Sequence, residues 1–184
     1  MFEKLKLQLK AFRDNDRGTV AVEAVVIFPM VMWAFLAMFV FFEGYRQTAI
    51  NHKAANTIAD MLSRETANIT PTYVDNTKDL FDLLAQANGD TKIRLSVIKW
   101  AERYDAYRVN WSKTEGQGVT PLDNDYLANI AHKLPTVPNQ ERMVLVETWS
   151  TYKPLFRIGL ENTVINTFVF TRLRFAPQLK FSNS

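Results

Sequence analysis

Residues 19–42 read TVAVEAVVIFPMVMWAFLAMFVFF and contain one ionisable side chain, Glu23. As a helix rising 1.5 Å per residue, this run would be about 36 Å long, whereas the hydrocarbon core of a bilayer is about 30 Å thick. We therefore expect a membrane-inserted helix. A conventional signal peptide is not expected, because its apolar region is shorter and no small-residue cleavage motif closes this run.

Glu23 is the unusual residue of the run. On insertion scales a carboxylate costs about 2.5–3.5 kcal/mol at the centre of a membrane helix, and less near an interface. Two interpretations are open. The carboxylate pairs with a group from a partner, or it extends to headgroup water and interacts with the positive end of the helix dipole.

The flanking charges predict the orientation of the helix. Residues 1–18 carry five basic and three acidic side chains, and this excess favours a cytoplasmic N-terminus with the C-terminal part on the far side. The chain has a net charge of +3, of which this leader supplies two, so the remainder lacks the concentrated basic face that nucleic-acid binding requires. Cysteine is absent, which excludes disulfides and thiolate metal sites.

We divide the chain into four parts: a basic cytoplasmic leader (1–18), a transmembrane helix (19–42), a helical spine (43–66) and an extracytoplasmic head (67–184). Apolar and small residues at helical spacing continue past residue 42, so one helix from about residue 20 to 65 is the simplest interpretation. Residues 2–13 either form a short helix on the inner membrane face or are simply a basic leader.

Two features of the long helix carry expectations of their own. Pro29 removes one helical hydrogen bond and predicts a kink. The alanines between Ala49 and Ala59 form a small-residue stripe, which we expect to pack on sister helices.

The remainder predicts an α+β head with a small sheet of four, mostly antiparallel, strands and additional helices. Residues 68–73, with Pro71, are expected to break the long helix. A helix over 75–88 should bury Leu80, Leu83, Leu84 and Ala87 and stop at Gly89. Alternation around residues 92–97 and 107–112 predicts a hairpin of half-buried strands. A loop at 115–120, a helix over 122–134 and strands at 142–152 and 164–175 complete the head.

Residues 18–29, GTVAVEAVVIFP, and the following FEGYR at 42–46 resemble the N-terminal region of TadE-like minor pilins, or pseudopilins. These proteins belong to the tight-adherence (Flp, type IVc) pilus system of bacteria. The shared pattern is a glycine, a small-residue pair, Val-Glu and a proline some six residues on. A weaker likeness, in VLVETWSTYKP at 144–154, is similar to the family strand that ends in a tyrosine-rich, proline-containing turn.

The resemblance implies that a prepilin peptidase cleaves after Gly18 on the cytoplasmic side and leaves Thr19 as the new N-terminus. Glycine gives the peptidase close access to the backbone. The Thr19 ammonium group would then pair with Glu23 of an adjacent subunit and set the register of assembly, each charge offsetting the desolvation of the other.

The resemblance also implies partners and location. The partners would be prepilin peptidase, other pilins and minor pilins, the inner-membrane assembly platform and membrane lipid. The protein would lie in the inner membrane with its head in the periplasm, or in the pilus after assembly. A head larger than that of a major pilin, and Thr19 where other mature pilins have an aromatic residue, favour a minor or initiating role.

No enzyme site is expected. Neither His52 nor His132 has a carboxylate or second histidine at metal spacing, so no catalytic residue, metal or cofactor is predicted. Trp100, Trp111 and Trp149 are expected to pack on the sheet. The main alternative is an unprocessed single-pass anchor whose head is a binding module of the cell envelope. A membrane-tethered enzyme is a more remote one.

Overall fold

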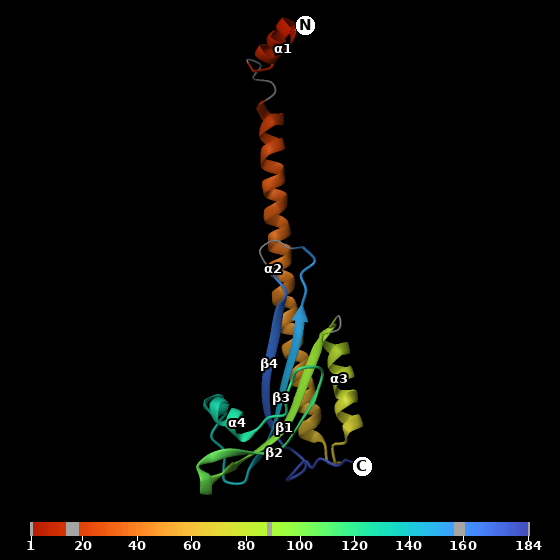
Figure 1. Ribbon diagram of the computed structural model, residues 1–184, viewed down its shortest axis with the longest axis vertical. Helices are drawn as coiled ribbons and strands as arrows, with labels where there is room; N and C mark the ends of the chain where they lie inside the picture. Colours follow the sequence, from red (N-terminus) through yellow and green to blue (C-terminus); the bar gives the residue numbers. More distant parts are fainter. Residues whose placement is uncertain (1, 14–18, 88–89, 157–160, 184) are drawn as a thin grey trace.

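A long helix and a small sheet organise the chain. A computed structural model describes residues 2–13, 19–87, 90–156 and 161–183. Helix α1 (Phe2–Arg13) is followed by α2 (Thr19–Arg64), a helix of 46 residues. Figure 1 shows the first part of α2 extending away from the head, while its last part lies along the sheet. The α+β fold with a long apolar N-terminal helix is confirmed.

The sheet has four antiparallel strands, β1 (Thr91–Ala101), β2 (Ala106–Glu115), β3 (Arg142–Tyr152) and β4 (Thr163–Arg172), in the order β2-β1-β3-β4. The predicted hairpin is β1 and β2, joined through a short 3-10 helix η2 (Glu102–Tyr104). The loop after β2 requires glycine at Gly116, whose φ is +108° and whose added Cβ would lie 2.8 Å from the Thr91 carbonyl oxygen.

Helix α2 packs on one face of the sheet. Its residues Ala54, Ile58 and Leu62 are buried against Val144 and Val146 of β3. Ala55 and Ala59 are buried as well. The prediction that the alanine stripe packs on sister helices is therefore wrong for these positions, because the head of the same chain covers them.

Helix α3 (Pro71–Ala85) begins four residues before the predicted start. Pro71 is the first residue of this helix, a position that proline favours. The Thr70 hydroxyl caps the helix by accepting a hydrogen bond from the Tyr73 amide. The helix ends at Ala85, and Gln86 takes the left-handed conformation there. Gly89, the predicted stop, lies outside the described residues.

The predicted apolar face of α3 is wrong in part. Leu80 is half-buried and Ala87, just after the helix, packs against the core, but Leu83 and Leu84 are exposed. The buried residues are Val74, Thr77, Phe81 and Ala85. This stripe follows helical spacing and includes a threonine, whose hydroxyl donates to the Tyr73 carbonyl and so removes the cost of burial.

The second face of the sheet carries α4 (Asn124–Ile130) and a 3-10 helix η3 (Ala131–Lys133), which together replace the predicted helix over 122–134. Leu127 and Ile130 pack there with Leu145 of β3. Because both faces of the sheet are covered, the central strand β1 is buried on both sides. Arg94 and Ser96, which alternation placed on a solvated face, are buried.

Candidate functional site

The first half of α2 has no cover from the described part of this chain. All residues from Val20 to Phe35 are exposed, although almost all of them are apolar. An apolar surface of this length is unfavourable in water, so lipid or other helices must cover it. The helix is long and apolar enough to cross a membrane, and it is compatible with a membrane anchor or signal anchor.

The predicted processing and register residues lie at the start of this helix. Helix α2 begins at Thr19, which places Thr19 and Glu23 one turn apart. Glu23 is exposed, and no described residue forms an ion pair with it. Gly18 lies outside the described residues, so cleavage at Gly18 stays a prediction. The roles of Thr19 and Glu23 in assembly also stay predictions.

Pro29 lies inside α2, which continues through it as one helix. Figure 1 shows no break in the ribbon of α2. The kink at Pro29 stays a prediction.

The head begins to cover α2 before the apolar run ends. Leu36 and Ala37 are half-buried, and Val40 is only 1% exposed. The Tyr152 hydroxyl at the end of β3 donates to the Val40 carbonyl oxygen at 3.5 Å. Two turns further on, Gln47 Nε2 donates to the Ala85 carbonyl of α3 at 2.6 Å. The sheet and α3 are therefore hydrogen-bonded to α2 near the point where the apolar run ends.

An ion pair marks the end of the apolar run. The Arg46 guanidinium donates to Glu43 through Nε at 2.8 Å and through a terminal nitrogen at 2.6 Å. The hydrogen bond from Arg46 lowers the pKa of Glu43. Burial raises the pKa of Tyr152, and the nearby Glu43 charge adds to this rise. Both groups therefore keep their usual charge states at neutral pH, with Glu43 ionised and Tyr152 neutral.

A second arrangement, which the sequence did not predict, lies on the face of the sheet opposite α2. Arg94 and Glu147 form a bidentate ion pair, with nitrogen–oxygen distances of 2.6 and 2.7 Å and side chains 6% and 4% exposed. The remaining terminal nitrogen of Arg94 donates to the Thr120 carbonyl at 3.2 Å. The guanidinium lies 4.8 Å from the ring centroid of Tyr126 and 5.4 Å from that of Trp149.

Arg94, Thr120, Tyr126 and Trp149 line a cavity of about 510 Å³. Its wall also includes Asp90, Lys92, Asp123 and Val164. Burial alone would lower the pKa of Arg94. The hydrogen bonds to Glu147 and the charge of Glu147 together outweigh this effect, so the net shift of the pKa is upward. The buried pair neutralises itself, which leaves Lys92 and the two aspartates as the charges of the cavity.

One signal in the sequence could have indicated this pair. Glu147 is the only charged residue in the otherwise uncharged stretch MVLVETW at 143–149, and a charge inside a buried strand needs a partner. The partner could not be identified from the sequence, because Arg94 lies 53 positions away and meets Glu147 only through the β1–β3 register.

The tryptophans pack on the sheet, as predicted. Trp100 meets Tyr107 edge to face at 5.0 Å, and Trp111 Nε1 donates to the Leu179 carbonyl at 2.7 Å. Trp149 also lines the cavity around Arg94. The two histidines are exposed. Within the described ranges, no group of three or more His, Asp or Glu side chains is arranged to hold a metal ion.

No protein-family model, curated protein or solved structure matches this chain. The resemblance to TadE-like pilins therefore depends on the residues alone.

Proposed function

We propose that this chain is a minor pilin or pseudopilin of a type IVc tight-adherence pilus. In this proposal prepilin peptidase removes residues 1–18, and the mature subunit primes, caps or forms the base of the pilus. The observation that supports this proposal best is α2 itself. One continuous helix has an uncovered apolar half with a single carboxylate near its start, and its other half is the core of an α+β head.

An assembling subunit needs a helix surface that changes partners. Before assembly lipid covers residues 20–35, and after assembly the helices of neighbouring subunits cover them. A surface that is apolar all round suits both environments, because lipid tails and packed side chains are similarly apolar. The position of the head is compatible with this exchange, since it covers α2 only from Leu36 onwards.

Glu23 gives the exchange a preferred register. A carboxylate in an apolar bundle is unfavourable unless it meets a positive charge. Cleavage after Gly18 would create such a charge, the Thr19 ammonium group, one helical turn away on each subunit. An ammonium group of one subunit and the Glu23 carboxylate of the next would pair only at one axial offset between the helices.

The proposal includes a location and partners. The mature helix would span the bacterial inner membrane with the N-terminus on the cytoplasmic side and the head in the periplasm. It would contact prepilin peptidase, other pilins and minor pilins, and the inner-membrane assembly platform. No catalytic role, cofactor or nucleic-acid partner is part of the proposal.

The intact mass of the protein from cells with and without prepilin peptidase activity tests the processing step. We expect a chain that starts at Thr19 in the first strain and retains residues 1–18 in the second. A chain that retains them in both strains would contradict the pilin proposal.

A pair of isosteric variants tests the register step. Glu23→Gln removes the carboxylate charge and should abolish piliation while the mature protein still accumulates in the membrane. Glu43→Gln is the matched control, because it neutralises a glutamate of the same helix beyond the apolar run and should leave piliation intact. Equal piliation in both variants would contradict the role of Glu23.

An unprocessed single-pass anchor with an envelope-binding head is the second candidate. The observation that favours it is the cavity of about 510 Å³ beside Arg94, which pilus assembly does not require. The two candidates differ in the mass measurement, because an anchor of this kind keeps residues 1–18 in both strains.

A further inference from the structure

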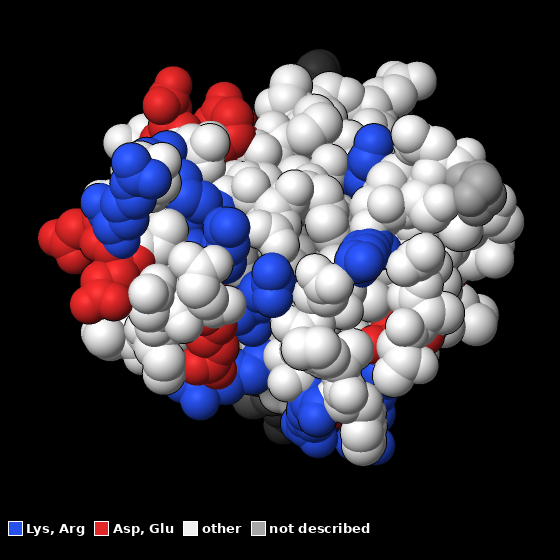
Figure 2. Space-filling view, turned by 90° about the horizontal axis from the view of Figure 1, so that it is seen from below, with Lys and Arg blue, Asp and Glu red and all other residues white. Residues whose placement is uncertain are grey.

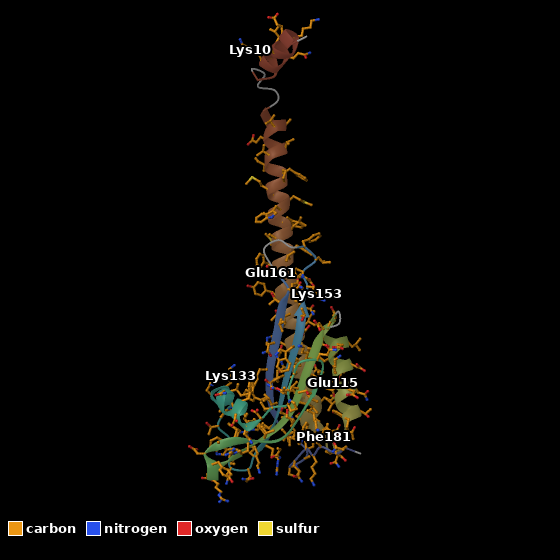
Figure 3. The ribbon with its side chains drawn as sticks, in the orientation of Figure 1. Lys10, Glu115, Lys133, Lys153, Glu161 and Phe181 are labelled. Carbon is orange, nitrogen blue, oxygen red and sulfur yellow. The ribbon has the colours of Figure 1, made fainter. Side chains whose placement is uncertain are left out.

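The described ends of the connection between β3 and β4, residues 153–156 and 161–162, lie near the end of the apolar run of α2. Figure 3 shows Lys153, just after β3, and Glu161, just before β4, beside α2 on the side of the head that faces the N-terminal half of the helix. Leu155 of this loop lines a cavity of about 300 Å³ together with Glu43, Arg46 and Lys153. Lys153 and Leu155 therefore lie at the level where α2 changes from apolar to polar.

Apolar side chains are exposed at this level. Leu155 is 78% exposed and Phe156 is 45% exposed, directly after the charged Lys153. The set continues on α2 and at the start of β4, and we call it the apolar collar: Phe41, Phe42, Tyr45, Leu155, Phe156 and Val164. Three separate segments thus contribute exposed apolar residues to one level of the molecule.

The opposite end of the head carries charged side chains and ion pairs. Figure 2 views that end and shows Lys and Arg side chains interspersed with Asp and Glu. Asp60 of α2 forms ion pairs there with Arg64 and Arg174 at 3.0 and 3.1 Å. The apolar collar is therefore a feature of the end near the apolar run and not of the whole head surface.

We propose that the apolar collar sits in the lipid headgroup layer, so that the head rests on the membrane instead of standing clear of it. The lipid surface would contact Leu155 and Phe156 of the β3–β4 loop, with Lys153 and Arg46 at the level of the phosphates. This inference depends on insertion of α2 into a bilayer, which both candidate functions share.

The lengths of the segments support this position. The apolar run would be about 36 Å long as a helix, which exceeds a hydrocarbon core of about 30 Å by about 6 Å. Head cover begins at Leu36, so it overlaps the last seven residues of the run, or about 10 Å of helix. A head that rests in the headgroup layer, which adds about 5–8 Å on each side of the core, accommodates this overlap.

The residue types of the collar also fit that layer. Tyrosine is enriched at the membrane–water interface, and the collar contributes Tyr45. Phenylalanine and leucine insert at the boundary between headgroups and acyl chains, and the collar contributes Phe41, Phe42, Leu155 and Phe156. Lys153 at this level can keep its aliphatic stem in the apolar zone and its charge near anionic headgroups, whereas the charge of Arg46 is already paired with Glu43.

The absence of native cysteine allows a clean test on the full chain. Single-cysteine variants carrying an environment-sensitive nitrobenzoxadiazole label are reconstituted in vesicles of phosphatidylethanolamine and phosphatidylglycerol, with and without spin-labelled lipid. Leu155→Cys reports on the collar. Met32→Cys reports on insertion of α2, and Phe175→Cys is the matched control, a 67% exposed apolar residue at the charged end of the head.

The expected result is loss of fluorescence on adding spin-labelled lipid for Leu155→Cys and Met32→Cys, with little loss for Phe175→Cys. Shallow spin labels should quench the label at position 155 more than deep ones, and the reverse should hold at position 32. Quenching at 32 but not at 155 would overturn the inference and leave membrane insertion standing. No quenching at 32 would overturn both. Equal quenching at 155 and 175 would show that the head lies on lipid without using the collar, which also overturns it.

Discussion

The Arg94–Glu147 pair allows a prediction of stability that follows directly from geometry. Its perturbations are Arg94→Met, Glu147→Leu and the double variant, which replace the charges by apolar side chains of similar size. Both partners are almost completely buried and make two hydrogen bonds to each other. Each single variant removes one partner and leaves the other charge in the core.

The magnitude follows from the cost of an uncompensated buried charge. Removing one partner of a buried ion pair lowers the free energy of unfolding by about 3–5 kcal/mol, whereas replacing both partners by apolar residues is often neutral or stabilising. We therefore expect each single variant to lose about 3–5 kcal/mol and the double variant to recover most of that loss. Arg94→Met should be the worse single variant, because it also ends the contacts with the Tyr126 and Trp149 rings and the Thr120 carbonyl.

The assay is urea unfolding of the full chain in detergent micelles, followed by tryptophan fluorescence, with the coupling energy taken from the double-mutant cycle. The exposed pair of Arg46 and Glu43 provides the matched control, since the corresponding cycle there should give a much smaller coupling energy. Single variants at Arg94 and Glu147 that each lose less than about 1 kcal/mol would refute the reasoning, because such a loss is typical of a hydrated surface pair.

Three further predictions concern the head. Gly116→Ala should lower the free energy of unfolding by more than about 1 kcal/mol, because of its positive φ and the close Thr91 carbonyl; Gly118→Ala, whose Cβ would have more room, should lose less in the same urea titration. Thr70→Ala removes the cap of α3 and should lose about 0.5–2 kcal/mol by urea unfolding, whereas Thr70→Ser should retain the cap and the stability. Burial raises the pKa of Tyr73 to about 12 from 10.0. The folded state thus holds this proton more tightly, so stability should be complete below pH 10 and fall as the pH approaches about 12. A Tyr73→Phe variant should lose the last step of the tyrosinate absorbance titration, and an unchanged titration would contradict the assignment.

The sequence predicted the elements whose signals are local. The apolar run and the small residues after it predicted α2 within one residue of each end. Strand β3 was predicted with its observed ends, and the alternation around 92–97 and 107–112 found the β1–β2 hairpin. These signals depend on residues that are near one another in the chain, so a single sequence is sufficient to show them.

The errors concern properties that depend on distant residues. Alternation in β1 predicted one solvated face, but the order of strands and the position of α4 bury both faces, and Arg94 becomes a core residue. The apolar face of α3 was assigned to its leucines, whereas packing against α2 and the sheet selects the stripe that includes Thr77 and Phe81. The cavity beside Arg94 is lined by residues of β1, β3 and the loop before α4. No local sequence pattern predicts that these segments are adjacent in space.

The unbroken course of α2 fixes the angular position of the head around the helix axis. A helix turns by about 100° per residue, so the 17 positions between Glu23 and Val40 place Glu23 about a quarter turn away from the line that the head covers. With no linker in between, a neighbour that meets Glu23 approaches the flank of α2 and finds the head always on the same side. One residue inserted among the exposed positions would turn the head by about 100° relative to Glu23 without altering a single contact inside the head.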